Sequence, residues 1–167
     1  MATIPKTQKF TDIRQELLRL SGEKRSADEL MEAITTLLNN RMLKYNWVGF
    51  YMLEASADPP VLVLGHYKGA MTPHTRIPLN QGICGAAAST GETVIVDDVG
   101  QDPRYLACSL ETKSEIVVPV FVHGKVAGEL DIDSHFPAAF GPEDRELVEY
   151  CAQLVGTFLE NQTAAGR

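Results

Sequence analysis

The chain of 167 residues is long enough for one domain with a hydrophobic core, and its 44% hydrophobic content is ordinary for a globular protein. A net charge of -7, with no block of Lys or Arg, argues against nucleic acid or an anionic membrane as the main partner and favours a small ligand. No apolar run is long enough to span a membrane, and the start MATIPKTQKF lacks the apolar stretch of a secretory signal. We therefore expect a cytoplasmic protein with a single domain over residues 1–167, of which residues 1–10 form a flexible N-terminal arm.

The first part of the chain predicts two helices. Apolar residues at helical spacing indicate a helix at about residues 12–20. Ser26 and Glu29 have the spacing of a capping box, which begins a second helix at about residues 27–43.

The middle of the chain has the periodicity of strands. Apolar residues alternate or run together in six segments, at residues 47–53, 61–67, 76–79, 93–96, 116–122 and 125–133. His123 and Gly124 form a two-residue connection between the last two segments, which predicts an antiparallel hairpin. An alanine-rich stretch from Cys84 to Thr90 indicates a short buried helix between strands.

The segment from Asp97 to Lys113 has no clean period and is predicted to be a long surface loop, of the kind that often binds a ligand. Pro142 then opens a last helix whose apolar stripe includes Cys151, so this cysteine is expected in the core. These elements predict an α+β domain with a six-stranded, mostly antiparallel sheet flanked by helices from both termini. The apolar stripes of the first and last helices can meet each other or a second subunit, and we favour a homodimer.

Residues 128–134, with the sequence GELDIDS, are the most informative segment. Strict alternation places Glu129, Asp131 and Asp133 on one face of a strand and two large apolar residues on the other. A row of carboxylates is costly to bury unless a cation, a metal or hydrogen-bond donors meet it. The segment therefore predicts either a ligand site or a solvated face at the edge of the sheet.

The three cysteines, Cys84, Cys108 and Cys151, are widely spaced and contain no CxxC pair, so neither a zinc motif nor a disulfide scaffold is indicated. Cys108 lies in the predicted loop near Arg104 and Lys113, where positive charge favours a nucleophilic thiolate. Cys84 begins the short predicted helix, whose dipole can also lower a thiol pKa. Simple packing as a small buried residue is the alternative for Cys84 and Cys108.

Two further features are candidates for a site. Glu115 begins a strand and is either a general acid or a solvated strand-end carboxylate. Trp47 and Tyr51 flank Gly49 on one strand face and can form the wall of a pocket, although aromatic strand residues are usually core. The histidines have no metal-ligand spacing, and the motifs of serine hydrolases, P-loops and dinucleotide sites are absent, so we expect no metal or organic cofactor.

Six motifs, taken in order, closely resemble those of the free methionine-(R)-sulfoxide reductases, which are small proteins of the GAF fold. They lie at residues 46–51, 76–78, 82–85, 107–108, 114–119 and 130–134. The resemblance implies a six-stranded antiparallel sheet with the ligand enclosed between the sheet and its loops. It also implies an oxidoreductase that acts on free methionine sulfoxide, requires no cofactor, and is recycled by thioredoxin or another thiol reductant.

Carried over position by position, the resemblance implies that Cys108 is the nucleophile, which becomes a sulfenic acid. It implies that Glu115, Asp131 and Asp133 hold the substrate and help to protonate it, and we favour Glu115 as the proton donor. The substrate-binding residues that it implies are Trp47, Tyr51, Glu115, Asp131 and Asp133.

The sequence departs from this family at His74, where a resolving cysteine is common. Cys84 occupies the remaining cysteine position, and it can resolve Cys108 directly if their Cα atoms approach within about 7 Å. Otherwise an external thiol must do so. A GAF-type sensor, which binds a small molecule without catalysis, is the alternative function.

Overall fold

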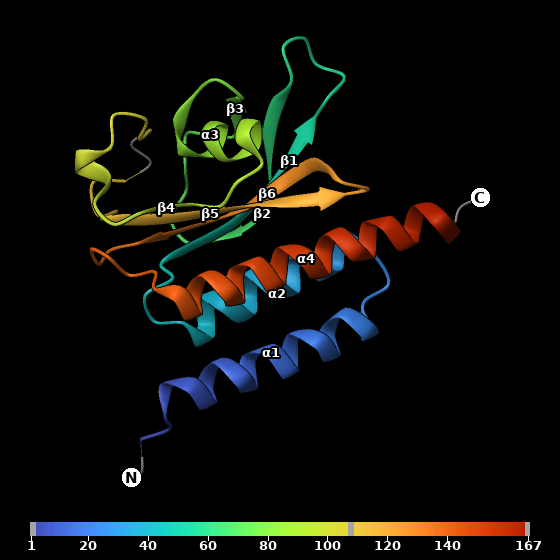
Figure 1. The fold of residues 1–167 in the computed structure, drawn as a ribbon, viewed down its shortest axis with the longest axis vertical. Helices are drawn as coiled ribbons and strands as arrows, with labels where there is room; N and C mark the ends of the chain where they lie inside the picture. The colour runs from blue at the N-terminus through green and yellow to red at the C-terminus, as the bar shows by residue number, and fades with distance from the viewer. Residues whose placement is uncertain (1–2, 107–108, 166–167) are drawn as a thin grey trace.

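Helices cover one face of a six-stranded sheet, and a short helix with the connecting segments covers the other (Figure 1). The computed structural model describes residues 3–106 and 109–165. The strand order is β3-β2-β1-β6-β5-β4, and every neighbouring pair is antiparallel. The predicted α+β class and the six-stranded antiparallel sheet are therefore confirmed.

The helices and strands follow the predicted segments closely. The helices are α1 (Lys6–Glu23), α2 (Ala27–Arg41), α3 (Gly82–Thr90) and α4 (Pro142–Ala165). The strands are β1 (Trp47–Glu54), β2 (Val61–Lys68), β3 (Arg76–Pro78), β4 (Val94–Val96), β5 (Ser114–Val122) and β6 (Lys125–Ser134). None of the helices among the described residues is both long enough and apolar enough to cross a membrane.

Local signals explain where several of these elements begin. The Ser26 side chain accepts a hydrogen bond from the Glu29 N–H at 3.1 Å and caps α2. The Glu29 carboxylate accepts from the Arg25 N–H at 3.0 Å, so the reciprocal bond of the capping box is shifted by one residue. His123 and Gly124 both have positive φ angles, 50° and 75°, as the predicted two-residue hairpin between β5 and β6 requires.

The N-terminal segment is more ordered than the sequence predicted. An arm was expected over residues 1–10, but α1 begins at Lys6 and Phe10 is buried. Phe10 stands three and seven residues before Ile13 and Leu17, so it extends the apolar stripe of α1 by one turn. Burial of this stripe fixes the first turns of the helix.

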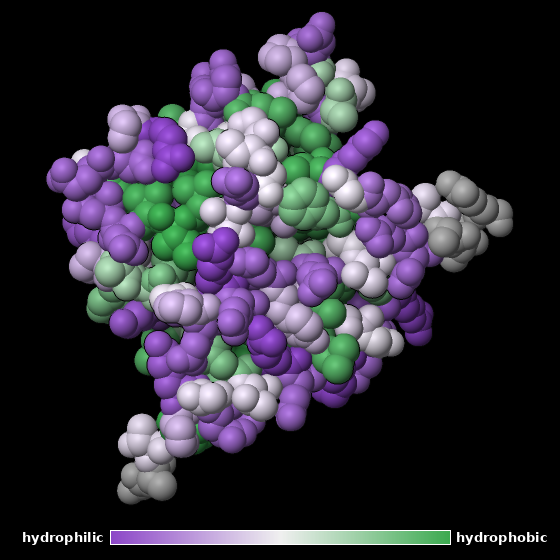
Figure 2. Space-filling model, viewed as in Figure 1, coloured by the Kyte–Doolittle hydropathy of each residue, from purple (hydrophilic) through white to green (hydrophobic). Residues whose placement is uncertain are grey.

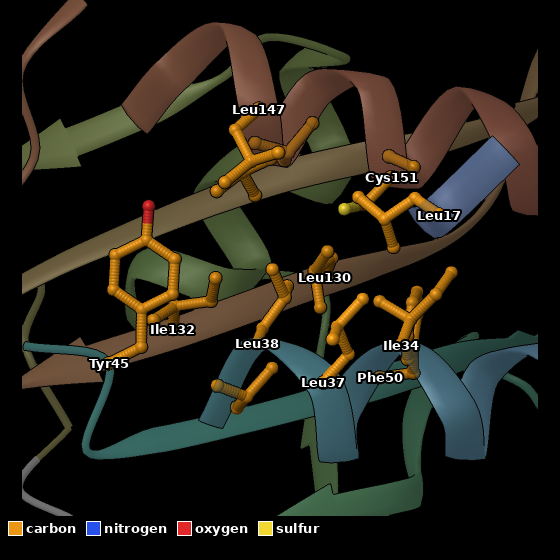
Figure 3. Packing of buried hydrophobic residues seen from close by; sticks show 14 of the residues in the cluster. Leu17, Ile34, Leu37, Leu38, Tyr45, Phe50, Leu130, Ile132, Leu147 and Cys151 are labelled. Atoms are coloured by element: carbon orange, nitrogen blue, oxygen red, sulfur yellow. The ribbon is translucent and has the colours of Figure 1, made fainter. Parts of the chain in front are cut away.

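The main hydrophobic core lies between the helices and the sheet (Figure 3). Leu38 of α2 and Leu147 of α4 lie in it with the apolar residues of β6, Leu17 of α1 joins it from a helix that packs on α2 and α4, and none of these leucines is exposed. Cys151 is also fully buried, which confirms its predicted core position. The stripes of α1 and α4 meet within one chain, and the homodimer stays a prediction.

A second hydrophobic cluster lies on the other face of the sheet, beneath α3. Its members include Trp47, Tyr51, Cys84 and Val117. The segment 97–113 was predicted to be a surface loop, but part of it is buried: it contains a short 3-10 helix (Val99–Gln101), and Val99 belongs to this cluster. Green side chains in Figure 2 gather mainly in the upper half of the view, around α3 and its neighbouring segments.

Candidate active site

The carboxylate face of β6 is buried beneath α3. Glu129, Asp131 and Asp133 are 0%, 3% and 4% exposed. The strand lies between β1 and β5 in the middle of the sheet, with Asp131 in register with Gly49 of β1 and Val117 of β5. A solvated edge face, one of the two predictions for this segment, is therefore wrong.

Glu115 joins these carboxylates from the neighbouring strand. It is in register with Asp133 across the β5–β6 pair, and it is 5% exposed. Its side chain contacts both Asp131 and Asp133 closely enough to affect the pKa of each. The alternative of a solvated strand-end carboxylate is wrong, because β4 and β6 cover both sides of this end of β5.

Cys84 enters the site from the first turn of α3. Its Sγ donates a hydrogen bond to Asp131 Oδ2 at 3.4 Å, and the residue is buried. Gly85 lets the helix pack this closely, because a Cβ there would lie 2.7 Å from the Leu79 carbonyl oxygen. The short helix predicted from sequence thus places a thiol directly over the carboxylates.

The surroundings of Cys84 suppress its thiolate. Burial raises the pKa of the thiol well above its ordinary value, and the negative charges of Asp131, Glu129 and Glu115 raise it further. The sequence suggested that the dipole of α3 lowers this pKa, and that suggestion is wrong. A helix terminus contributes a partial charge, whereas three carboxyl groups surround the thiol.

Burial also keeps protons on the carboxyl groups. It raises the pKa of Asp131 to about 6 and the pKa of Asp133 and Glu129 well above the usual range. The negative charge of Asp131 further raises the pKa values of Glu129 and Asp133. A side-chain contact with Glu115 lowers the pKa values of Asp131 and Asp133 and so opposes part of the effect of burial. A cation bound beside these groups would favour their ionised forms and so lower their pKa values.

Several buried oxygens have no hydrogen-bond partner among the described residues. They are Oε1 and Oε2 of Glu129, Oδ1 of Asp131 and Oδ1 of Asp133. Glu129 is near enough to the Cys84 thiol to affect its pKa, but neither oxygen meets hydrogen-bond geometry with a described residue. Unpartnered buried carboxyl oxygens are costly, and they mark a place where a ligand can supply the missing donors.

Trp47 and Tyr51 form an aromatic wall on the same face of the sheet. The Trp47 ring stacks on Tyr67 with centroids 5.6 Å apart, and its Nε1 donates to the Ala70 carbonyl at 3.0 Å. The Tyr51 hydroxyl donates to the His74 carbonyl at 2.7 Å. Both residues belong to the second cluster, as expected of core residues, and of the two only Tyr51 is among the described residues that line a cavity beneath α3.

A small cavity of about 20 Å³ lies where these groups meet. It is lined by Tyr51, His74, Ile77, Gly82, Ile83, Cys84, Leu106, Glu115 and Asp131. Such a volume holds about one water molecule, so an amino acid binds only if the surrounding side chains move apart. A larger groove of about 1130 Å³ beside α4 includes Phe121 and Tyr150 but no cysteine.

The structure thus brings together most of the residues that the sequence singled out. Cys84, Glu115, Asp131 and Tyr51 line the cavity, and Trp47 and Asp133 lie on the same sheet face without lining it. Cys108 lies outside the described residues. Glu129 was seen as part of the carboxylate row but was not assigned to the site, although its alternation with Asp131 already placed it on the same face.

Comparisons with known proteins show the family of the chain. The GAF domain family matches residues 26–159. The free methionine-R-sulfoxide reductase of Escherichia coli is 33% identical over 150 residues, which cover 89% of this chain and 88% of that protein. The reductase of the same name from Saccharomyces cerevisiae is 44% identical over 111 residues, which cover 66% of this chain but only 61% of the yeast protein.

A solved structure extends the likeness to three dimensions. The X-ray structure of the Neisseria meningitidis free methionine-R-sulfoxide reductase in complex with its substrate matches with a TM-score of 0.88 and 30% identity. The match covers 98% of this chain and 96% of the other. On the fold, the buried site and these relatives together, the chain belongs to the GAF domain family and, within it, to the free methionine-R-sulfoxide reductases.

Proposed function

We propose that this protein reduces free L-methionine-(R)-sulfoxide to methionine in a thiol-dependent reaction. The observation that carries the proposal is the buried cluster of Cys84, Glu115, Asp131 and Asp133 on one sheet face, in which Oδ1 of Asp131 and Oδ1 of Asp133 lack hydrogen-bond partners among the described residues. Neither lysine nor arginine is among the side chains that line the cavity. Such a site favours a ligand that brings its own positive charge, and the family supports methionine sulfoxide as that ligand.

A free amino acid supplies the missing donors. Its ammonium group carries three N–H donors and a positive charge, which Asp131 and Asp133 can accept in their ionised forms. The carboxyl group of Glu115 is then the nearest acid for the sulfoxide oxygen. The aromatic side chains of Trp47 and Tyr51 border the same face and suit the apolar side chain of methionine.

The chemical step rests on Cys108, whose role comes from the family resemblance. The Cys108 thiolate attacks the sulfoxide sulfur, and Glu115 provides a proton as the sulfur–oxygen bond breaks. The oxygen is transferred to Cys108 as a sulfenic acid, and methionine leaves with its sulfur reduced. No metal or organic cofactor takes part in this step.

Recycling then falls to Cys84, since His74 stands where the family commonly has another cysteine. The Cys84 thiol condenses with the sulfenic acid to give a disulfide and water. Asp131 accepts the thiol hydrogen bond at 3.4 Å and is placed to take the proton as the thiol attacks. Thioredoxin or another thiol reductant restores both cysteines by exchange.

The proposal is tested by mixing the protein with each epimer of free methionine sulfoxide and excess dithiol, then measuring the methionine formed. We expect turnover of the R epimer and none for Cys108→Ser, because a hydroxyl is a far weaker nucleophile than a thiolate. N-acetylated substrate should react poorly, since acylation removes the ammonium charge. If neither epimer turns over while free methionine sulfoxide still binds, the protein is a sensor of the GAF type.

A further inference from the structure

We propose that the cavity is also a binding site for a single divalent transition metal ion, zinc by preference, held by Cys84, Glu115 and Asp131. The proposal that a metal binds here does not require that the protein reduces methionine sulfoxide. The three residues come from α3, β5 and β6, so their spacing along the chain gives no metal motif. The expectation that no metal binds was drawn from the spacing of the histidines and cysteines and from the family resemblance, and neither considers these three residues together.

The three donor atoms are grouped closely, and one of the distances between them matches a zinc site. The Cys84 sulfur and one carboxylate oxygen each from Glu115 and Asp131 are all within 4.8 Å of one another. For tetrahedral zinc, with bonds of about 2.3 Å to sulfur and 2.0 Å to oxygen, the sulfur and oxygen should be about 3.5 Å apart. The Cys84 Sγ to Asp131 Oδ2 distance is 3.4 Å.

The cavity has room for an ion without any opening of the site. Its volume of about 20 Å³ fits one sphere the size of a water molecule, and all three donor residues line it. Asp131 is only 3% exposed, and its Oδ1 has no hydrogen-bond partner among the described residues. A buried, unpartnered carboxylate oxygen beside a cavity of this size favours a small cation over a neutral ligand.

The donor chemistry selects the kind of metal. A thiolate with two carboxylates suits a borderline ion such as Zn²⁺, whereas Mg²⁺ and Ca²⁺ prefer oxygen ligands alone. His74 lines the cavity but is not one of the residues whose donor atoms lie within 4.8 Å of one another. Three protein ligands around one ion are the number found in catalytic zinc sites.

Co²⁺ is the probe that tests this proposal, because a cobalt–thiolate bond gives a charge-transfer absorption band. Metal is added without oxygen to wild type and to the Cys84→Ser, Cys108→Ser and Cys151→Ala variants, and the band is titrated. We expect one equivalent of Co²⁺, displaced by Zn²⁺, in wild type, Cys108→Ser and Cys151→Ala. Cys84→Ser should lose the thiolate band and bind more than about 100-fold more weakly, since even outer-shell partners of a metal are worth 10–100-fold.

Asp131→Asn provides the second arm, because it keeps the thiol and the shape of the side chain. Its Co²⁺ affinity should fall while circular dichroism shows the variant folded. A thiolate band that persists in Cys84→Ser and vanishes in Cys108→Ser would overturn the proposal and place the metal on Cys108. Absence of any band in the wild type would also overturn the proposal and would mean that the Cys84–Asp131 contact is a hydrogen bond only. Neither result depends on whether the protein reduces methionine sulfoxide.

Discussion

Asp131 connects the thiol, the carboxylates and the cavity, and under the proposed function we expect it to have opposite effects on folding and on substrate binding. Burial raises its pKa to about 6, above the value of about 3.9 expected in an unfolded chain. Between these two pH values the folded protein binds more protons than the unfolded one. The free energy of unfolding therefore falls as pH rises from about 4 to about 6, and the loss remains at higher pH.

Asp131→Asn should consequently stabilise the unliganded protein at pH 7.5 while impairing its function. The variant has no proton to lose, so its stability should gain about 1–3 kcal/mol at pH 7.5 and depend less on pH between 4 and 6. Binding of the substrate ammonium should weaken by about 1.5–3 kcal/mol, seen as a higher KM. Denaturant unfolding at pH 4 and pH 7.5 checks the first part, and a variant less stable than wild type at pH 7.5 would contradict it.

Cys84→Ser separates chemistry from recycling. With one equivalent of substrate and no reductant, wild type should release one methionine and form a Cys84–Cys108 disulfide, detectable by peptide mass mapping. Cys84→Ser should release the same methionine but stop at the Cys108 sulfenic acid, which a small dithiol rescues and thioredoxin rescues poorly. Cys151→Ala, a change in the main core, is the matched control and should behave as wild type. Normal cycling of Cys84→Ser with thioredoxin would leave Cys84 a packing residue.

The sequence predicted which residues share a face of the sheet better than it predicted the charges that surround each of them. Alternation alone placed Asp131 and Asp133 on one face, and the structure confirms it. The pKa of Cys84 was misjudged because its carboxylate neighbours come from β5 and β6, which lie far from it along the chain. Local sequence shows a helix terminus, but it does not show which charges the fold brings to it.

Among the elements, β1 carries the aromatic wall because Gly49 leaves space for it. A Cβ at Gly49 would collide with the Trp47 ring and lie 3.0 Å from Cβ of Tyr67. Gly49→Ala should therefore displace the ring, raise KM and change the fluorescence of Trp47, which is the single tryptophan of the chain. Gly65→Ala on β2 is the control, since a Cβ there meets its nearest atom, the Phe50 carbonyl oxygen, at 3.4 Å. Unchanged fluorescence and KM in a folded Gly49→Ala protein would contradict this account of the wall.

All six strands and the hairpin were predictable because each has a strong local signal, either period two or a two-residue turn. The limits of α1 were less predictable. The only buried apolar anchor of α1 before Ile13 is Phe10, the fifth residue of the helix, and its contribution depends on α4 and α2, against which the helix packs. The partial burial of segment 97–113 likewise depends on a hydrophobic cluster built from several elements.

For the whole molecule, the sheet separates a stabilising core from a functional one. Leu17→Ala in α1 should cost about 2–5 kcal/mol of unfolding free energy, because Leu17 is fully buried in the core on the helical side. The KM of the folded variant should stay unchanged, since the site lies on the other face. Leu18→Ala, at a position 60% exposed on the same helix, should change stability by less than about 0.5 kcal/mol. A raised KM in Leu17→Ala would show that the two faces are coupled.

The position of β6 in the sheet also bears on hydrogen exchange. The strand pairs with β1 on one side and β5 on the other, so its amides should exchange only through openings close to global unfolding. Ligand binding should then add little local protection along β6, and should slow exchange mainly in α3 and in residues 69–75, which contact the site from outside the sheet. The carboxylates proposed to bind the ligand would thus lie on the slowest-exchanging backbone of the molecule. Entry of the ligand would instead depend on the faster-exchanging segments that cover the site.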